Sequence, residues 1–270
     1  MKSNTKRNAN IAIVLLYAVV FILPYLFNIQ NDWFVFLEQP LLIFLPAWLG
    51  ARFYLHTKEN KRPVGFPGKR PDRHTVLLLV VIAVLLFPVI NFVAEQFLFL
   101  AAEAPGEAFL FVPEATEGTI HAILTFFYGA VYFAVFPGFC EEYLFRGVLL
   151  TLMREAEWKT PVILIGNALL FGLFHFNLEQ FFYTTVLGLV LTAVVLITNS
   201  LYAGMILHFV YNFIVSLPDI LSVEAGRFQD LYMGYFYHTD TWLPALLSGA
   251  AIVFLLILLN RKKPGQNHTA

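Results

Sequence analysis

Two adjacent glutamates and one arginine interrupt a long apolar run of the sequence. The segment 138–150 reads GFCEEYLFRGVLL, and Glu141, Glu142 and Arg146 are its charged residues. A charged side chain near the middle of a membrane helix costs about 2.5–3.5 kcal/mol on insertion scales. Charged residues that remain in such segments usually pair with one another or serve a function. These three residues therefore mark a candidate site.

Helical spacing separates the two glutamates. Glu142 and Arg146 are four residues apart, so they can pair along one face of a helix. Glu141 lies about 100° around the helix from Glu142 and is five residues from Arg146, which is a poor spacing for the same bridge. We therefore expect Glu142 and Arg146 to form a supporting ion pair and Glu141 to be the base. The alternative, in which both carboxylates are structural, stays open at this point.

Two histidines accompany the carboxylates within predicted apolar helices. They are His175 in the sequence FGLFHF and His208 in the sequence MILHFVYN. His208 and Asn212 are four residues apart, so both project from one helix face, where such donors could stabilise an oxyanion. Asn167 is expected to form a helix-packing hydrogen bond. Cys140 is the single cysteine of the chain and is expected to be a plain buried thiol.

The composition indicates what surrounds these residues. The chain is 59% hydrophobic and 13% charged, whereas an average soluble domain is roughly 25% charged. We predict an all-α polytopic integral membrane protein whose 270 residues form a single membrane domain. Apolar stretches of about 20 residues predict eight transmembrane helices. Their ranges are 10–29, 33–55, 75–102, 119–153, 160–176, 178–199, 202–217 and 241–260.

Loop charges predict the orientation of these helices. If both termini are cytoplasmic, the lysines and arginines cluster in the cytoplasmic segments, while Arg227 is external and Arg146 lies within the membrane. The predicted external loop 103–118 contains no basic residue. This asymmetry follows the positive-inside rule, so cytoplasmic N- and C-termini are predicted. The long fourth helix contains Pro137-Gly138, which predicts a kink just before the charged segment.

Three motifs of this sequence resemble the signature motifs of the CPBP family. They are Glu141-Glu142-x-x-x-Arg146, Phe171-x-x-x-His175 and His208-x-x-x-Asn212. The family comprises the CAAX proteases and bacteriocin-processing enzymes, including the type II CAAX prenyl endopeptidases. Each motif alone is weak, but all three occur in order, each in a predicted membrane helix. The resemblance covers the fourth to seventh predicted helices.

The resemblance implies an intramembrane endopeptidase. Its substrate would be a membrane-anchored or lipidated peptide or protein, cleaved near the cytosolic face, and a bacterial plasma membrane is expected because the family is commoner there. Glu141 would activate a water together with His175, while His208 and Asn212 would stabilise the oxyanion. Glu142 and Arg146 would brace the helix. The expected partners are the substrate and the lipid bilayer, with no nucleic acid, and the oligomeric state is not predicted.

Several alternatives stay open at this level. Family members are often catalogued as metalloproteases, and Glu141, His175 and His208 could ligate zinc. We favour a mechanism that requires no cofactor, because Asn212 beside His208 suits an oxyanion donor better than a zinc ligand. A non-catalytic scaffold or bacteriocin-immunity factor of the same fold is one rival function. An ion- or proton-coupled transporter is another, because buried glutamates and histidines also form proton relays.

One geometric requirement follows from the predicted helices. Glu141 and His175 each lie about 25 Å from a turn near residue 157, at 1.5 Å per residue. His208 lies only about 10 Å from the turn near residue 201 on the same reckoning. The two histidines can meet only if the first hairpin projects further than the second, or if the sixth helix tilts or starts short.

Overall fold

The computed structural model describes residues 2–26, 36–56, 68–97, 126–217 and 242–261. These residues form helices, and the single β-bridge among them pairs Gly68 with Ser200. The helical segments, in chain order, are α1 (Lys2–Leu26), η1 (Gln39–Phe44), α3 (Leu45–His56), α4 (Arg73–Phe97), η3 (Val131–Val135), η4 (Pro137–Glu141), η5 (Tyr143–Leu149), α6 (Leu150–Glu155), α7 (Thr160–Leu173), α8 (Leu178–Thr198), α9 (Leu201–Val215) and α12 (Trp242–Arg261). The prediction of an all-helical fold is confirmed for this part of the chain.

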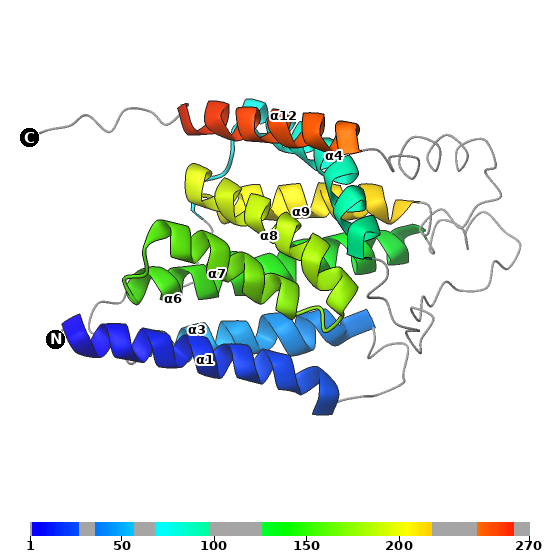
Figure 1. Ribbon diagram of the computed structural model, residues 1–270. Helices are drawn as coiled ribbons and strands as arrows, with labels where there is room; N and C mark the ends of the chain where they lie inside the picture. The colour runs from blue at the N-terminus through cyan, green and yellow to red at the C-terminus, as the bar shows by residue number, and fades with distance from the viewer. Residues whose placement is uncertain (1, 27–35, 57–67, 98–125, 218–241, 262–270) are drawn as a thin grey trace, which may run out of the picture.

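Several helices are suited to a lipid environment. In the described ranges, four helices are long and apolar enough to cross a membrane, namely those at Asn4–Leu23, Arg73–Phe97, Gln180–Thr198 and Trp242–Arg261. Helices α7 and α9 are shorter apolar helices. The first residues of α1 and the last residues of α12 lie at the same end of the bundle (Figure 1). The eight crossings and the cytoplasmic termini stay predictions, and the predicted external loop 103–118 and Arg227 lie outside the described residues.

The helices pack as a bundle with two outer pairs (Figure 1). Helix α1 packs against α3 and α6 at one edge, and α4 packs against α12 at the opposite edge. The segments η3 to α6, together with α7, α8 and α9, lie between these pairs. The buried apolar core runs through all of these elements and includes Leu79, Leu144, Phe171 and Leu207. The charged segment therefore lies in the centre of the bundle rather than on its lipid-facing edge.

The helix that carries the charged segment is wound largely in π-helical turns. The segments η3, η4 and η5 are π-helical and lead directly into α6. A π-turn closes i→i+5 hydrogen bonds, is rare, and occurs frequently at functional sites. Pro137, which has no N–H to donate, begins η4. The sequence predicted a kink at Pro137-Gly138, and the structure has a π-helical segment that begins there.

Gly138 permits a close approach between two site-bearing helices. A Cβ atom added at Gly138 would lie 3.1 Å from the backbone nitrogen of Phe209 in α9. Any larger side chain at this position would therefore push η4 away from α9. Glu141 lies at the end of η4 and His208 precedes Phe209, so this contact sets the separation of the two chain segments that carry them.

Candidate active site

Glu142 is the hub of a buried ionic cluster. Its Oε1 accepts a hydrogen bond from the Arg146 guanidinium at 2.7 Å, and the side chains of both residues are fully buried. The pair predicted from the i, i+4 spacing is therefore confirmed. The same Oε1 lies 3.0 Å from Nδ1 of His208 in α9. Because an ionised carboxylate only accepts hydrogen bonds, Nδ1 of His208 is the donor in this contact.

Arg146 is held by further partners on α8. Its guanidinium donates to the Gly188 carbonyl at 3.1 Å, and its Nε lies 3.4 Å from Oγ1 of Thr192. The Thr192 hydroxyl also lies 3.2 Å from Oδ1 of Asn167 in α7. The Asn167 amide donates in turn to the Phe145 carbonyl at 2.8 Å, which confirms its predicted packing role. This network ties α7 and α8 to the charged helix.

His175 lies at a different place in the secondary structure than the sequence suggested. The prediction of an apolar helix over 160–176 placed His175 inside it, but α7 ends at Leu173 and His175 lies in the turn that follows. The next residue, Phe176, has a positive φ of 54°, which carries the chain out of the helix. Asn177 then caps α8 by accepting a hydrogen bond from the Gln180 backbone N–H at 3.0 Å.

The backbone fixes the tautomer of His175. Its Nδ1 lies 2.9 Å from the Phe171 carbonyl oxygen. A carbonyl can only accept a hydrogen bond, so Nδ1 carries the proton that is donated. In the neutral imidazole, Nε2 then has a lone pair and can accept a proton from a water molecule.

The Phe171 ring is the point at which the histidines meet. Its centroid lies 5.0 Å from the His175 ring and 5.8 Å from the His208 ring, both edge to face. The Arg146 guanidinium lies over the same ring, 4.4 Å from its centroid. Phe171 is fully buried. The structure therefore brings His175, His208 and the ionic cluster together around one aromatic side chain.

The arrangement of the hairpins explains how the histidines reach one depth. Figure 1 shows that the turn between α6 and α7 extends further toward the end of the bundle that carries the α1 start than the turn between α8 and α9 does. Figure 1 also shows α8 inclined to α9 and α12. The sequence left two arrangements open, a projecting first hairpin and a tilted sixth helix. Both are present, and the tilted helix is α8.

Glu141 and Asn212 flank this cluster. Glu141 is 7% exposed and interacts electrostatically with His208, Glu142 and Arg146. Asn212, one turn after His208, donates one amide hydrogen to the Phe133 carbonyl at 3.2 Å. A carboxamide has two such hydrogens, so this contact engages one of them. The roles predicted for Glu141 and Asn212 stay predictions.

Three small residues contribute to the site but were not assigned a role from the sequence. Gly188 and Thr192 contact Arg146, as described above. A Cβ atom added at Gly204 would lie 2.8 Å from Oε2 of Glu142, so only glycine leaves room for that carboxylate. Their spacing is a signal that could have revealed them. Gly204 lies four residues before His208 and thus on the same helix face, and Gly188 and Thr192 are two small residues four positions apart. Small residues at this spacing are typical of close helix–helix contacts in membranes.

The donor groups of the two histidines and Glu141 bear on whether zinc could bind at this site. Nδ1 of each histidine already has a partner, and a ring of this kind often ligates a metal through Nε2. Three or more ligands must nevertheless converge on one point. The described residues contain no group of three or more His, Cys, Asp or Glu side chains arranged to hold a metal ion. In this part of the chain Glu141, His175 and His208 are thus not arranged as a metal-binding group, and the metal dependence stays a prediction.

Comparison with known proteins bears on the same segment. Residues 123–214 match the family model described as type II CAAX prenyl endopeptidase Rce1-like. This range contains all three motifs, and it confirms the resemblance to the CAAX protease and CPBP family over this part of the chain. No curated protein and no solved structure gave a match. The family match and the apolar helices together indicate an integral membrane protein related to a peptidase family.

Proposed function

We propose that the protein is an intramembrane endopeptidase in which Glu141 activates a water molecule for attack on a peptide bond. The observation that carries this proposal is the meeting of His175 and His208 on the Phe171 ring, beside a buried Glu142–Arg146 pair. The segment that assembles these residues is the one that matches an endopeptidase family. A buried ionic cluster that only stabilised the fold would not require two histidines around it.

Glu141 and His175 are assigned to the water. Glu142 is engaged by Arg146 and His208 through one oxygen, which makes it a support for the cluster rather than a base. Glu141 is the adjacent carboxylate and is almost fully buried, so bulk water does not compete for it. The protonated Nδ1 of His175 leaves Nε2 to accept a hydrogen bond from the attacking water. The two groups together would hold and deprotonate that water.

His208 and Asn212 are assigned to the oxyanion. Both side chains are proposed to act as hydrogen-bond donors, His208 in its protonated form. An imidazolium oriented by Glu142 would present Nε2–H to the developing oxyanion. The second amide hydrogen of Asn212 would be the other donor. Stabilisation of this type is commonly the largest single contribution to acyl-transfer catalysis.

The substrate proposed is a membrane-anchored or lipidated peptide, cleaved near the cytosolic face of a bacterial plasma membrane. A site formed by apolar helices is reached most directly by a chain that is already in the bilayer. The excess of lysines and arginines near the α1 end of the bundle supports a cytosolic position for that end by the positive-inside rule.

Hydrolysis of fluorogenic membrane peptides by the purified protein tests this proposal. Glu141→Gln and His175→Ala should each lower turnover by about 10²-fold or more, because general acid–base groups contribute about 10²–10⁴-fold. His74→Ala, at an exposed position on α4, is the matched control and should keep wild-type turnover. If none of the membrane peptides is cleaved, or if Glu141→Gln keeps full turnover, the result would support a non-catalytic membrane protein instead.

A further inference from the structure

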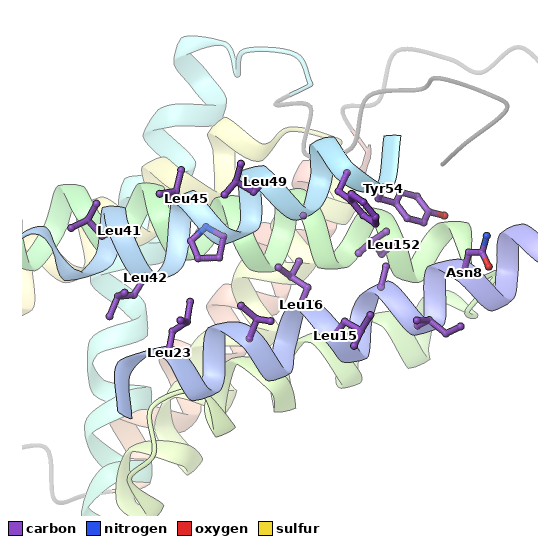
Figure 2. A pocket seen from close by; sticks show the side chains of 16 residues that line it. Asn8, Leu15, Leu16, Leu23, Leu41, Leu42, Leu45, Leu49, Tyr54 and Leu152 are labelled. Atoms are coloured by element: carbon purple, nitrogen blue, oxygen red, sulfur yellow. The ribbon is translucent and has the colours of Figure 1, made fainter. Parts of the chain in front are cut away.

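A long groove separates α1 from the helix formed by η1 and α3 (Figure 2). Its volume is about 760 Å³, which is within the roughly 300–1,000 Å³ of small-molecule sites. The lining is apolar along most of its length, and its polar residues are Asn8 and Tyr54. Figure 2 shows these two side chains at one end of the groove and Leu23 and Leu41 toward the other. The groove therefore has a polar mouth and an apolar body.

The shape of the groove suits a hydrocarbon chain. The lining residues on α1 run from Asn8 to Leu23, which spans about 22 Å at a rise of 1.5 Å per residue. Gly50 on α3 lines the groove opposite α1, and a Cβ atom there would lie 3.2 Å from Cδ1 of Leu16. The absence of that side chain keeps the two walls close without closing the groove. Leu152 of α6 also lines it.

Cationic side chains gather at the polar mouth. Lys6 and Arg7 are exposed on α1, and Arg7 is one turn before the lining residue Ile11. On the opposite wall, Arg52 is exposed and is three residues after the lining residue Leu49. By helical register, Arg7 and Arg52 thus flank the groove-facing sides of their helices.

The two arginines place positive charge beside this end of the groove. Arg52 also lies over the Trp48 ring, with its Cζ 5.0 Å from the centroid. Glu155 of α6 adds a negative charge near this end, where it interacts electrostatically with Tyr54. Lys6 is two residues before the lining residue Asn8 and so lies on another face of α1, which leaves two arginines and one carboxylate among the residues named here. Basic residues between or beside membrane helices near the cytoplasmic membrane surface attract anionic lipid headgroups.

We propose that this groove binds one chain of an anionic phospholipid, with its phosphate beside Arg7 and Arg52. The apolar body takes the hydrocarbon chain, and Asn8 and Tyr54 lie at the level of the glycerol esters. The orientation agrees with a lipid of the leaflet at the α1 end of the bundle. This inference concerns a lipid site away from Glu141, and it holds whether or not the protein is a peptidase.

Native mass spectrometry of the purified full-length protein tests the headgroup preference. The probes are phosphatidylglycerol and phosphatidylcholine with identical acyl chains. One phosphatidylglycerol should be retained more tightly than phosphatidylcholine, and Arg7→Gln and Arg52→Gln should each weaken its retention about fivefold. Phosphatidylcholine retention should not change in either variant. Arg73→Gln, an exposed arginine at the start of α4, is the control and should leave both lipids unaffected.

A second pair of variants tests the location. Leu49→Trp fills the groove at a position that is 51% exposed, and Leu246→Trp places the same side chain at a 59% exposed position on α12. Both proteins should melt at the wild-type temperature, but only Leu49→Trp should lose the tight phosphatidylglycerol, by fivefold or more. The proposal is overturned if the wild type retains the two lipids equally. It is also overturned if Leu49→Trp and Leu246→Trp retain phosphatidylglycerol equally. A mass spectrum that shows a bound second protein copy or a bound peptide instead of the lipid also overturns it.

Discussion

Replacement of Gly204 by alanine tests the geometry of the ionic cluster. The added Cβ atom would lie 2.8 Å from Oε2 of Glu142 and 2.8 Å from Cγ2 of Val195. Separations below 3.0 Å force a neighbouring group to move. Within the described residues, Oε2 of Glu142 is buried and has no hydrogen-bond partner, whereas Oε1 has two. Any rotation of the carboxylate away from the new methyl group therefore disturbs its bonds to Arg146 and His208.

The size of the effect follows from three contributions. Overpacking of a core costs about 1–3 kcal/mol. The loss of one charged hydrogen bond of Glu142 costs about 1.5–3 kcal/mol more. Alanine has a helix propensity about 1 kcal/mol more favourable than glycine, which offsets part of this cost. The free energy of unfolding should therefore fall by about 2–5 kcal/mol.

The assay is denaturant unfolding of the purified protein in detergent, followed by circular dichroism. The control is Gly249→Ala in α12, where a Cβ atom would have no neighbour within 4 Å. Gly249→Ala should be neutral or stabilise the protein by up to about 1 kcal/mol, because only the helix-propensity gain remains. If Gly204→Ala unfolds at the same denaturant concentration as Gly249→Ala, the proposed close contact with Glu142 is refuted.

Three further predictions concern the same cluster. Arg146→Met should destabilise the protein by about 3–5 kcal/mol, because the buried Glu142 carboxylate loses its guanidinium partner, whereas Arg154→Met at an exposed position should cost little in the same unfolding assay. Thr192→Val should lower the free energy of unfolding by about 1–3 kcal/mol because it removes the hydroxyl between Arg146 and Asn167. Thr198→Val, which removes a hydroxyl that donates to the Val194 carbonyl one turn earlier, should lower the free energy of unfolding by less. Protein shown to be metal-free by elemental analysis should keep its peptidase activity, and activity lost on chelation and restored by zinc would contradict the metal-free proposal.

The sequence was sufficient to predict features that depend on local spacing. The Glu142–Arg146 pair, the buried thiol of Cys140 and the packing role of Asn167 follow from helical periodicity and side-chain chemistry, and all three are confirmed. The turn predicted near residue 157 also forms, with Glu157 at a positive φ of 60°. The ion pair and the turn depend on contacts within one helix or between chain neighbours, whereas Asn167 bonds to a carbonyl on another helix, and only its type of role was predicted.

Features that depend on how the helices pack were not predictable in this way. The contact between Glu142 and His208 joins residues 66 positions apart, so no spacing rule reveals it. The end of α7 before His175 depends on the left-handed conformation of Phe176, a residue type that gives no local signal for a turn. The π-helical winding around Pro137 was not predicted either, because the sequence pattern indicates a kink at a proline but not how the surrounding turns are wound.

The central claim is that Glu141 is the base and Glu142 its structural neighbour, and the two single glutamine variants test it most directly. Turnover of a fluorogenic membrane peptide and the free energy of unfolding should be measured on the same preparations. Glu141→Gln should unfold like the wild type and lose turnover by about 10²-fold or more. Glu142→Gln should lose stability, because its buried partner Arg146 is left without a counter-charge. The opposite pattern, with stability lost in Glu141→Gln and turnover lost in a stable Glu142→Gln, would contradict the account.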